Sequence, residues 1–597
     1  MRAKTTWIWL VLAVTLFAFI VIFQHFQHSR RIPSANILDG FRPAEVTSVQ
    51  VIPSGALEIR ADLTNGNWFL TKPISYPAQT AAIQSLLDSL KNLTFATRIG
   101  ATELREHKTS DADFGFDNPQ FSIEIHTPDN RWQILVGNKT PPGDQVFMRV
   151  VGEDGAFVTD AKWLDAIPRS ATVWRDTSLV SAAEKDFDSI ILSNNAKGLV
   201  IELHQNPTNH LWRMTRPLQS RADSERITAA LQQLQSARIT RFVTDDSNAD
   251  LSVFGLQPAE MVFCLGHGTN FTTGFRIGKA ITNDTTQIFA RRKNYNAIVT
   301  TSKDTLSTWF GSVNSFRDPL LMEFTAEPAE IEVRGENNFT LRRDGTNAWT
   351  IAGEKFSADA DEVQLFIKIL ASLRVKDFVK DVVTAPDLES YGLNKPTREI
   401  IVRSGGDTNS VIADLSFAVT TNGIYVHRAD EDFIYSISPS DFNRLPENAF
   451  EFRDRGIWHF SEKDVAQITM KQNGKTRVVV RTGDNKWSLA PGSVGIINPP
   501  ALEETAHRFG QLDARPYGWV GRNAVEADRY GWNTNNLQVT FELKDGQKLS
   551  VDFGAELPSA HTALAAVTLD GERWAFIFPP TLYQFVLSYL TIPANVP

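Results

Sequence analysis

Three sequence markers recur along this chain in a fixed order, and this repetition constrains its fold more than any other feature. A tryptophan that follows a polar turn comes first in each copy, at Trp68, Trp212, Trp349 and Trp487. An aromatic-Gly-apolar triplet comes second, at 114–116, 254–256, 391–393 and 530–532. Both markers recur at intervals of about 140 residues, so the sequence predicts four tandem copies of one unit, each with its own core.

The third marker, aromatic-Arg-Asp, closes the first three copies, at Trp174-Arg175-Asp176, Phe316-Arg317-Asp318 and Phe452-Arg453-Asp454. Four domains also suit a chain of 597 residues. These markers predict repeat units over 40–180, 181–324, 325–458 and 459–597, after an N-terminal segment of residues 1–31. Because no long Pro/Gly/Ser linker separates the units, we expect an extended, stacked arrangement.

One amphipathic helix is predicted between the tryptophan and the triplet of each copy. Apolar residues with helical spacing mark it, as in segments 81–90 and 361–370. Ser224 and Asp359 are the expected helix starts in the second and third copies. Matching apolar pairs fall at equivalent places, namely Leu87/Leu90, Leu231/Leu234, Leu370/Leu373 and Phe509/Leu512.

The rest of each unit alternates apolar and polar residues over short segments, which is typical of strands with one buried face. Turn signals separate these segments, including Asn65-Gly66, Asp344-Gly345 and Gly483-Asp484, and a recurring glycine turn is expected at Gly137, Gly278 and Gly554. The glycine inside each triplet is expected to adopt a positive φ or to approach another backbone segment closely. We therefore predict an α+β fold with six or seven mainly antiparallel strands and one principal helix per unit.

The N-terminus carries an apolar stretch, Trp7 to Phe23, that contains no charged residue. Extended by the next three residues, it would form a helix about 30 Å long, enough to cross the hydrocarbon core of a bilayer. A cleaved signal peptide is the alternative, but no small-x-small cleavage site follows the stretch. We predict a single-pass transmembrane signal-anchor in the cytoplasmic (inner) membrane, with everything after about Arg31 periplasmic. His25 and His28 are expected to be interfacial polar residues rather than metal ligands.

Composition excludes several classes of protein. A hydrophobic fraction of 42% and a charged fraction of 22% are those of a globular chain. The net charge of -9 and the lack of a long basic run argue against a nucleic-acid partner. The one cysteine, Cys264, rules out a disulfide within the chain and is expected to be a buried thiol in a strand.

No catalytic motif occurs in the sequence, which lacks GxSxG, HExxH, CxxC and Walker patterns. Segment 266–271, Gly-His-Gly-Thr-Asn-Phe, lacks the third glycine of a dinucleotide loop and is expected to form a hairpin turn. The acidic pairs Asp430/Glu431 and Glu503/Glu504 are interpreted as solvated faces, with a two-carboxylate glycosidase as the alternative. We therefore predict no enzyme activity and no catalytic, cofactor-binding, nucleotide-binding or metal-binding residues.

Two recurring residue types remain as candidates for binding. The Arg-Asp pairs are expected to tie neighbouring units together, and a binding clamp is the alternative. The four repeated tryptophans are expected in the cores. Carbohydrate stacking is the alternative for non-repeated ones, among them Trp132, Trp163, Trp519 and Trp574.

Four features together point to a known family, namely the repeated tryptophan, the leucine-rich helix, Tyr-Gly-Leu-Asn-Lys-Pro at 391–396 and Phe-Arg-Asp at 452–454. In these features the chain resembles the bacterial DUF 4340 family, a domain of unknown function. The resemblance covers nearly the whole region after the apolar stretch, although the first copy has Phe-Gly-Phe and the last lacks the proline and the Arg-Asp end. It implies a membrane-anchored protein encoded beside ABC-type transporter components and a gliding-motility-type auxiliary protein. It supplies no catalytic residues.

A repeated surface without a site motif favours a non-enzymatic envelope scaffold or accessory protein that contacts envelope protein partners. An ABC-type transporter assembly is the partner that the resemblance implies. The alternative is a binding module for envelope glycans or lipids that uses grooves between repeat units.

Overall fold

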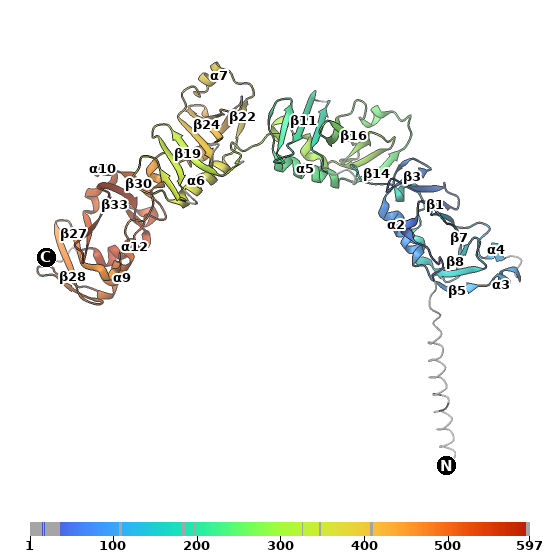
Figure 1. Cartoon of the computed structure of the whole chain (residues 1–597), viewed down its shortest axis with the longest axis horizontal. Helices are drawn as coiled ribbons and strands as arrows, with labels where there is room; N and C mark the ends of the chain where they lie inside the picture. Colours follow the sequence, from blue (N-terminus) through green and yellow to red (C-terminus); the bar gives the residue numbers. More distant parts are fainter. Residues whose placement is uncertain are drawn as a thin grey trace, which may run out of the picture. The chain divides into compact units, whose positions relative to one another are not determined.

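The computed structural model describes residues 36–106, 110–181, 186–195, 197–324, 326–344, 348–405 and 410–592, together with Thr15 and Phe17. The chain divides into two compact halves, Met1–Arg317 and Asp318–Pro597, and each half contains two sheets (Figure 1). All strands of a sheet come from one contiguous part of the chain. We call these four parts, each a sheet with its helices, repeats 1 to 4 in chain order.

Repeats 1 and 2 each contain a nine-stranded antiparallel sheet, with the strand orders β4-β3-β2-β1-β6-β7-β8-β9-β5 and β13-β12-β11-β10-β15-β16-β17-β18-β14. The elements of repeat 1 are β1 (Ser48–Pro53), β2 (Ile59–Thr64), β3 (Asn67–Lys72), β4 (Tyr76–Pro77), α2 (Thr80–Lys91), β5 (Phe95–Ile99), α3 (Ala101–Glu106), α4 (Ser110–Asp113), β6 (Phe121–His126), β7 (Arg131–Lys139), β8 (Gln145–Val150) and β9 (Ala156–Asp160). Those of repeat 2 are β10 (Ser189–Asn194), β11 (Leu199–Gln205), β12 (Trp212–Arg216), β13 (Ser220–Arg221), α5 (Ser224–Ser236), β14 (Ile239–Thr244), β15 (Met261–His267), β16 (Asn270–Ile281), β17 (Asp284–Arg292) and β18 (Ile298–Ser302).

Repeats 3 and 4 each contain an eight-stranded antiparallel sheet, with the strand orders β21-β20-β19-β23-β24-β25-β26-β22 and β29-β28-β27-β31-β32-β33-β34-β30. The elements of repeat 3 are β19 (Pro328–Arg334), β20 (Phe339–Asp344), β21 (Ala348–Ile351), α6 (Ala360–Ser372), β22 (Asp377–Lys380), α7 (Ala385–Ser390), β23 (Arg398–Ser404), β24 (Val411–Thr420), β25 (Gly423–Arg428), β26 (Ile434–Ile437) and α8 (Pro439–Phe442). Those of repeat 4 are β27 (Val465–Gln472), β28 (Lys475–Gly483), β29 (Lys486–Leu489), α9 (Pro499–Phe509), β30 (Trp519–Arg522), α10 (Ala527–Tyr530), α11 (Trp532–Asn535), β31 (Leu537–Leu543), β32 (Lys548–Leu557), β33 (Thr562–Leu569), β34 (Glu572–Ile577) and α12 (Pro580–Phe585).

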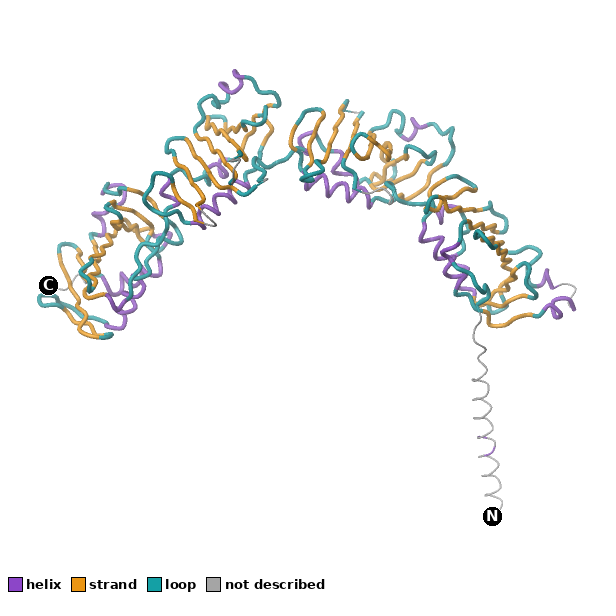
Figure 2. Tube along the Cα trace, in the orientation of Figure 1, coloured by secondary structure: helices purple, strands orange, loops and turns teal. Residues whose placement is uncertain are grey.

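All four sheets share one topology, which explains why each repeat has one principal helix, α2, α5, α6 or α9. The first strand lies inside the sheet, and the strands of the first hairpin continue from it toward one edge. The strand that follows the principal helix lies at the opposite edge, so the helix carries the chain from one edge of the sheet to the other. Figure 2 shows the principal helices lying beside the strands of their own repeats.

Helix α2 illustrates how a repeat builds its core. Four of its apolar side chains share one helical face and are fully buried, namely Ile83, Leu86, Leu87 and Leu90. They belong to one hydrophobic cluster with inward-facing strand residues such as Val49 and Ile123. Burial of each such side chain stabilises the fold by roughly 1.5–3 kcal/mol.

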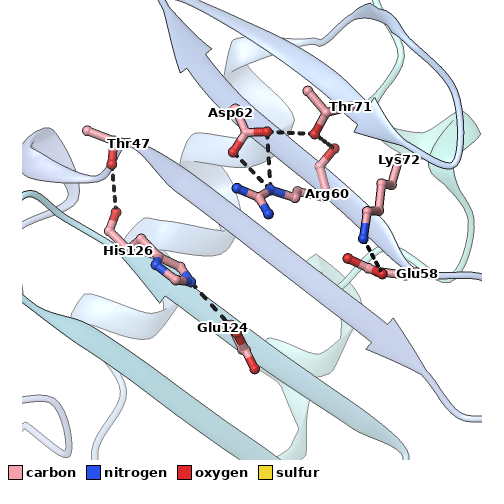
Figure 3. Close-up of polar contacts among 8 residues, drawn as sticks. All are labelled: Thr47, Glu58, Arg60, Asp62, Thr71, Lys72, Glu124 and His126. Atoms are coloured by element: carbon pink, nitrogen blue, oxygen red, sulfur yellow. Dashed lines mark hydrogen bonds and ion pairs between the residues drawn. The ribbon is translucent and has the colours of Figure 1, made fainter.

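Along β2, the other face of the repeat 1 sheet is polar. Along β2, the buried Ile59 and Ala61 alternate with the half-buried Arg60 and Asp62. Figure 3 shows the side chains of Arg60 and Thr71 directed at the Asp62 carboxylate. The Arg60 Nε lies 3.1 Å from Asp62 Oδ1, and the Thr71 hydroxyl donates to Oδ2 at 2.6 Å. This alternation is the pattern that predicted strands with one buried face.

The glycine of each triplet has a positive φ, so this sequence prediction is confirmed. The φ angles are 77°, 67°, 74° and 66° at Gly115, Gly255, Gly392 and Gly531. In repeat 1 the triplet contacts β7 through its backbone, because the Asn138 N–H donates to the Phe114 carbonyl at 2.8 Å. A Cβ at Gly115 would lie 2.7 Å from the Asn138 nitrogen. Glycine is therefore required here both by its φ and by the close approach of the strand.

The prediction that Gly137, Gly278 and Gly554 form turns is wrong. These glycines lie inside β7, β16 and β32, at irregularities in the pairing of those strands. A Cβ at these positions would come within 2.0, 2.2 and 2.3 Å of the carbonyl oxygen of the triplet's first aromatic residue. Close contact with the triplet, and not a turn, therefore explains this second recurring glycine.

Two further local predictions need correction, and two predicted helix starts are confirmed. The repeats have eight or nine strands instead of six or seven, because edge strands of two to four residues, such as β4, β13, β22 and β30, are too short to show alternation. Helix α5 begins at Ser224 and is capped by Asp223, and Asp359 caps α6, so both predicted helix starts are confirmed. Cys264 lies in β15 as predicted but is only half-buried, because it lies on the opposite face of the strand from its buried neighbours Phe263 and Leu265.

Most of the predicted anchor lies outside the described residues. No helix among the described residues is both long and apolar enough to cross a membrane. Of the predicted span over 7–26, only Thr15 and Phe17 are described, and both are helical; His25 and His28 lie outside the described residues. Residues 345–347 also lie outside them, so the anchor and the turn at Asp344-Gly345 stay predictions.

Candidate functional site

The aromatic-Arg-Asp segments are the recurring residues that sequence analysis left open between a joint and a binding clamp. In each segment the buried aromatic residue ends a short 3-10 helix, namely η3 (Ala171–Trp174), η6 (Val313–Phe316) or η7 (Ala449–Phe452). Its carbonyl oxygen accepts a hydrogen bond from the N–H of the residue that precedes the principal helix, at 2.7, 2.9 and 2.7 Å for Gln79, Asp223 and Asp359. The segment thus closes its own repeat by fixing the start of the principal helix.

The aspartate of the segment fixes the chain as it leaves the repeat. Asp176, Asp318 and Asp454 each accept, on Oδ1, a hydrogen bond from the backbone N–H two residues later. The donor–acceptor distance is 2.9 Å in all three cases. Each aspartate therefore forms a local side-chain turn and serves the backbone.

The arginine of the first segment reaches from repeat 1 into repeat 2. The Arg175 side chain is 2% exposed, and its guanidinium lies 4.4 Å from the ring centre of Tyr76 and 3.5 Å from that of Phe242. Two of its nitrogens donate to the two carboxylate oxygens of Asp245, at 2.7 and 3.0 Å. Bidentate pairing fixes the orientation of the guanidinium, and ring stacking adds attraction.

The arginine of the third segment reaches from repeat 3 into repeat 4 in the same way. The Arg453 guanidinium lies 4.3 Å from the ring centre of Trp574 and 4.9 Å from that of Phe356. One of its nitrogens donates to Asp570 at 3.0 Å. Phe356 here takes the place that Tyr76 has beside Arg175, two residues before the alanine that pairs with the arginine. This geometry agrees with the expected role of joining units.

The second segment lies at the end of the first half, where Arg317 pairs through its backbone with Ala222 and donates to Asn314 at 3.3 Å. The arginines of the two joints recur in the sequence, but their partners do not. Phe242, Asp245 and Asp570 belong to no recurring motif, so no sequence signal marks them.

A cleft of about 520 Å³ lies beside the joint between repeats 1 and 2. Its walls are residues 67–69 of β3, residues 77–80, residues 176–178, Ser181, Arg238, residues 272–274 of β16 and residues 292–295 at the end of β17 and after it. Trp68 is 5% exposed, so the half-buried Phe69 and Tyr295 offer the aromatic surface of the cleft. This is the kind of groove that the ligand-binding alternative requires.

The basic side chains of the cleft differ in how far they are engaged. Arg238 donates from Nη1 to three carbonyls at the end of α5, at 2.9 to 3.1 Å, and so caps that helix. Arg292 lies 3.4 Å from Asp176. Lys293 is exposed and has no ion-pair partner within the described ranges of the chain. A ligand in this cleft would meet Lys293 as its available positive charge.

The acidic pairs singled out in the sequence are engaged by arginines. Glu431 is 9% exposed at its side chain and lies 3.4 Å from Arg428, which also meets Asp430 at 2.8 Å. The Glu503 side chain is 17% exposed and pairs with Arg481 at 2.8 Å. The prediction of solvated faces is therefore wrong for Glu431 and Glu503. Each neutralises a buried guanidinium.

The remaining candidate residues also take structural places. All four repeated tryptophans are buried, as predicted for core residues: Trp68, Trp212, Trp349 and Trp487. Trp163, Trp519 and Trp574 are buried too and offer no surface for carbohydrate, while Trp132 is half-buried and packs edge-on against Phe41. In the part of the chain that the structure describes, no three His, Cys, Asp or Glu side chains are grouped to hold a metal ion.

These observations define a tandem-repeat α+β protein with four antiparallel sheets of one topology. The model of a family described as Domain of unknown function (DUF4340) matches residues 68–210, 212–396 and 349–533, and the chain belongs to this family. A search of curated proteins found no match. Among solved structures, the DNA polymerase III subunit beta from Pseudomonas aeruginosa aligns with 68% of this chain and 95% of its own, at 10% identity and a TM-score of 0.11, too low to compare folds.

Proposed function

We propose that this chain is a non-enzymatic scaffold of the bacterial envelope. In this proposal residues 7–26 anchor it in the cytoplasmic membrane, and everything after about Arg31 is periplasmic. Its repeats contact other envelope proteins, and the family resemblance suggests subunits of an ABC-type transporter. The exposed side chain of Phe17, 70% accessible on a helical residue, is compatible with a lipid-facing position.

The observation that carries the proposal is that the recurring arginines and aspartates make structural contacts. A repeated ligand site would leave its arginines and aspartates accessible, as Lys293 is in the cleft. Instead, Arg175 and Arg453 are buried between neighbouring repeats, and the following aspartates hold backbone turns. Such joints keep two neighbouring repeats in a fixed relation, which a protein that presents surface to partners needs.

Partner capture tests the scaffold. A tagged full chain, purified from detergent-solubilised membranes, is expected to bring down transporter subunits or other envelope proteins, identified by mass spectrometry. The matched variant carries Arg175→Ala and Arg453→Ala, and we expect it to stay in the membrane fraction but to recover less partner. Recovery of no envelope protein by the wild-type chain contradicts the proposal.

Protease accessibility tests the topology. Protease added to intact spheroplasts is expected to digest the repeats while cytoplasmic marker proteins stay whole. Full protection of the repeats under these conditions would place them in the cytoplasm and overturn the envelope assignment.

The cleft between repeats 1 and 2 favours a second candidate function, the binding of envelope glycans or lipids. Phe69 and Tyr295 offer ring faces for a sugar, and Lys293 offers a charge for an acidic group. Cell-wall fragments added to the full chain are expected to raise its thermal midpoint, and Tyr295→Ala together with Lys293→Glu is expected to abolish the rise. An unchanged midpoint of the wild-type chain would eliminate this candidate.

A further inference from the structure

At one inward strand position, repeat 4 has a buried arginine where the other three repeats have an apolar residue. Arg477 of β28 pairs in register with Met470 of β27 and is 6% exposed. It faces the same side of the strand as the fully buried Val479. The first buried position of the corresponding strand in the other repeats holds an apolar residue, namely Ile59, Ile201 or Phe339. One inward position has thus changed from apolar to cationic.

Arg477 has no carboxylate partner among the residues that the structure describes. One of its terminal nitrogens donates to the carbonyl of Ile496, and its Nε is buried without a hydrogen-bond partner. Arg398 and Arg428 are also buried, but they meet carboxylates at 3.0 and 2.8 Å. Burial lowers the pKa of the Arg477 guanidinium, but a guanidinium stays protonated in proteins. A buried cation without a counter-ion is strongly destabilising, so an anion supplied from outside would stabilise this site.

Arg477 lines a pocket of about 160 Å³. Most of its other walls are apolar or weakly polar, namely Met470, Val479, Ile496, Ile497, Leu502, Tyr589 and Thr591, with Asn498 and Ser588 as further polar residues. The backbone of Gly495 covers the guanidinium, because a Cβ there would lie 3.5 Å from the Arg477 Cζ. Ile496 is 94% exposed and Tyr589 is 37% exposed, so apolar surface continues from the pocket to solvent.

The neighbouring start of helix α9 offers no free backbone donor for an anion. Its first two residues are Pro499 and Pro500, which have no N–H. The N–H of Ala501 is already bound to the Asn498 side chain at 3.2 Å. Recognition of a negative charge in this pocket therefore depends on Arg477.

We propose that this pocket binds a carboxylate carried by a short aliphatic group. The carboxylate pairs with the guanidinium edge of Arg477 that includes the unsatisfied Nε, and the aliphatic part lies against Met470 and Leu502. A single guanidinium balances one negative charge, which favours a monocarboxylate over a phosphate with its larger charge. The pocket volume suits a carboxylate with its first few carbons, and the exposed Ile496 provides apolar contact for the rest.

Saturation-transfer difference NMR on the full chain with hexanoate tests the chemistry of this ligand. We expect saturation transfer to the hexanoate methyl and methylene protons, and none to hexan-1-ol or hexylamine at the same concentration. Acetate and inorganic phosphate are expected to displace hexanoate poorly. Binding of hexan-1-ol equal to that of hexanoate would show that the pocket does not recognise the negative charge. Displacement of hexanoate by phosphate at equal concentration would show that the pocket does not recognise the aliphatic group. Either result overturns the proposal.

Two variants assign the binding to Arg477. Arg477→Leu restores the residue type of the other repeats, so we expect it to fold with a thermal midpoint at least as high as that of the wild type. Its affinity for hexanoate is expected to fall at least about tenfold. The control, Arg131→Leu, removes an arginine of repeat 1 whose side chain is 59% exposed and should leave the signal unchanged. Hexanoate binding retained by Arg477→Leu, or binding that appears only after removal of residues 593–597, would contradict the proposal.

Discussion

The joint between repeats 1 and 2 and the joint between repeats 3 and 4 use the same arginine position in different surroundings. Arg175 stacks on Phe242 and pairs through two nitrogens with Asp245, which directly follows β14. Arg453 stacks on Trp574 and pairs through one nitrogen with Asp570, in the turn between β33 and β34. The aromatic ring and the carboxylate thus come from different places in the following repeat.

Each of these repeats therefore fixes its own arginine but not the partners of that arginine. Arg175 and Arg453 are both held by backbone pairing with the alanine before the principal helix, Ala78 or Ala358. The next repeat then needs to supply only a ring face and a carboxylate within reach. Because the ring and the carboxylate differ between the two joints, removal of these partners should reduce stability by different amounts in the two joints.

Removal of the aromatic partner is expected to have the largest effect, and a larger one in the second joint. Trp574 is fully buried, so Trp574→Ala should lower the free energy of unfolding of repeat 4 by about 3–5 kcal/mol. Phe242 is half-buried, and Phe242→Ala should cost repeat 2 about 1–2 kcal/mol. Hydrogen exchange of the β34 and β14 amides in the full chain measures both values. Equal losses of free energy of unfolding would show that the two rings stabilise their joints equally.

Removal of the arginine itself is expected to cost about 2–3 kcal/mol in either joint. The loss stays below that of breaking a fully buried pair, because Asp245 and Asp570 have side chains 38% and 63% exposed and become hydrated. Hydrogen exchange around each joint in Arg175→Ala and Arg453→Ala is the measurement. The control is Arg131→Ala, which removes a 59% exposed arginine and should cost less than about 1 kcal/mol. A loss of stability no greater than that of Arg131→Ala would show that the arginine does not join the two repeats.

Removal of the carboxylate charge should produce a smaller difference in stability between the two joints. Asp245→Asn breaks a bidentate pair and is expected to cost about 1 kcal/mol. Asp570→Asn weakens a single hydrogen bond at a more exposed site and is expected to cost less than about 0.5 kcal/mol. Chemical denaturation of both variants beside the wild type gives the comparison. The reverse order of costs would show that contact geometry does not set the strength of these pairs.

Alkaline pH should affect the first joint alone and by the smallest amount. Burial raises the pKa of Tyr76 above its ordinary value of 10.0, although Arg292 and Arg175 act against this shift. The folded state therefore holds the phenol proton more tightly than the unfolded state, so stability from this group is complete below pH 10 and declines as pH rises through the folded pKa. The second joint has Phe356 at this place and should show no such decline. Stability curves of the wild type and Tyr76→Phe between pH 9 and 11 test this, and identical curves would contradict it.

The repetition in the sequence predicts most of the fold because residues that recur in every copy mark backbone conformations that all copies share. The triplet glycines show this, since the positive φ of Gly115 is required by the chain itself. The second recurring glycine does not form the turn that the sequence predicts, because a glycine that makes room for another segment has the same local signature as a turn glycine. Gly137 faces the Phe114 carbonyl from inside β7, and no local pattern reveals that contact.

The candidate site is less predictable because its partners come from distant, unrepeated positions. Arg175 is marked by its motif, but Asp245 is one of many acidic residues in loops. Glu431 illustrates the opposite error, since its acidic neighbour suggested a solvated surface while the fold buries it against Arg428. Arg477 could have been noticed as a charge in an alternating strand pattern, but its missing counter-ion is visible only in three dimensions.

A double-mutant cycle on Arg175 and Asp245 in the full chain tests most directly the claim that the recurring arginines join repeats. The stability of the two single variants and of the double variant is measured beside partner capture from solubilised membranes. We predict a coupling of about 1–3 kcal/mol between the two side chains, and partner loss no greater than the loss of stability explains. Coupling near zero, with variants as stable as the wild type that nevertheless fail to capture a partner, would contradict the account and make the arginine a binding residue.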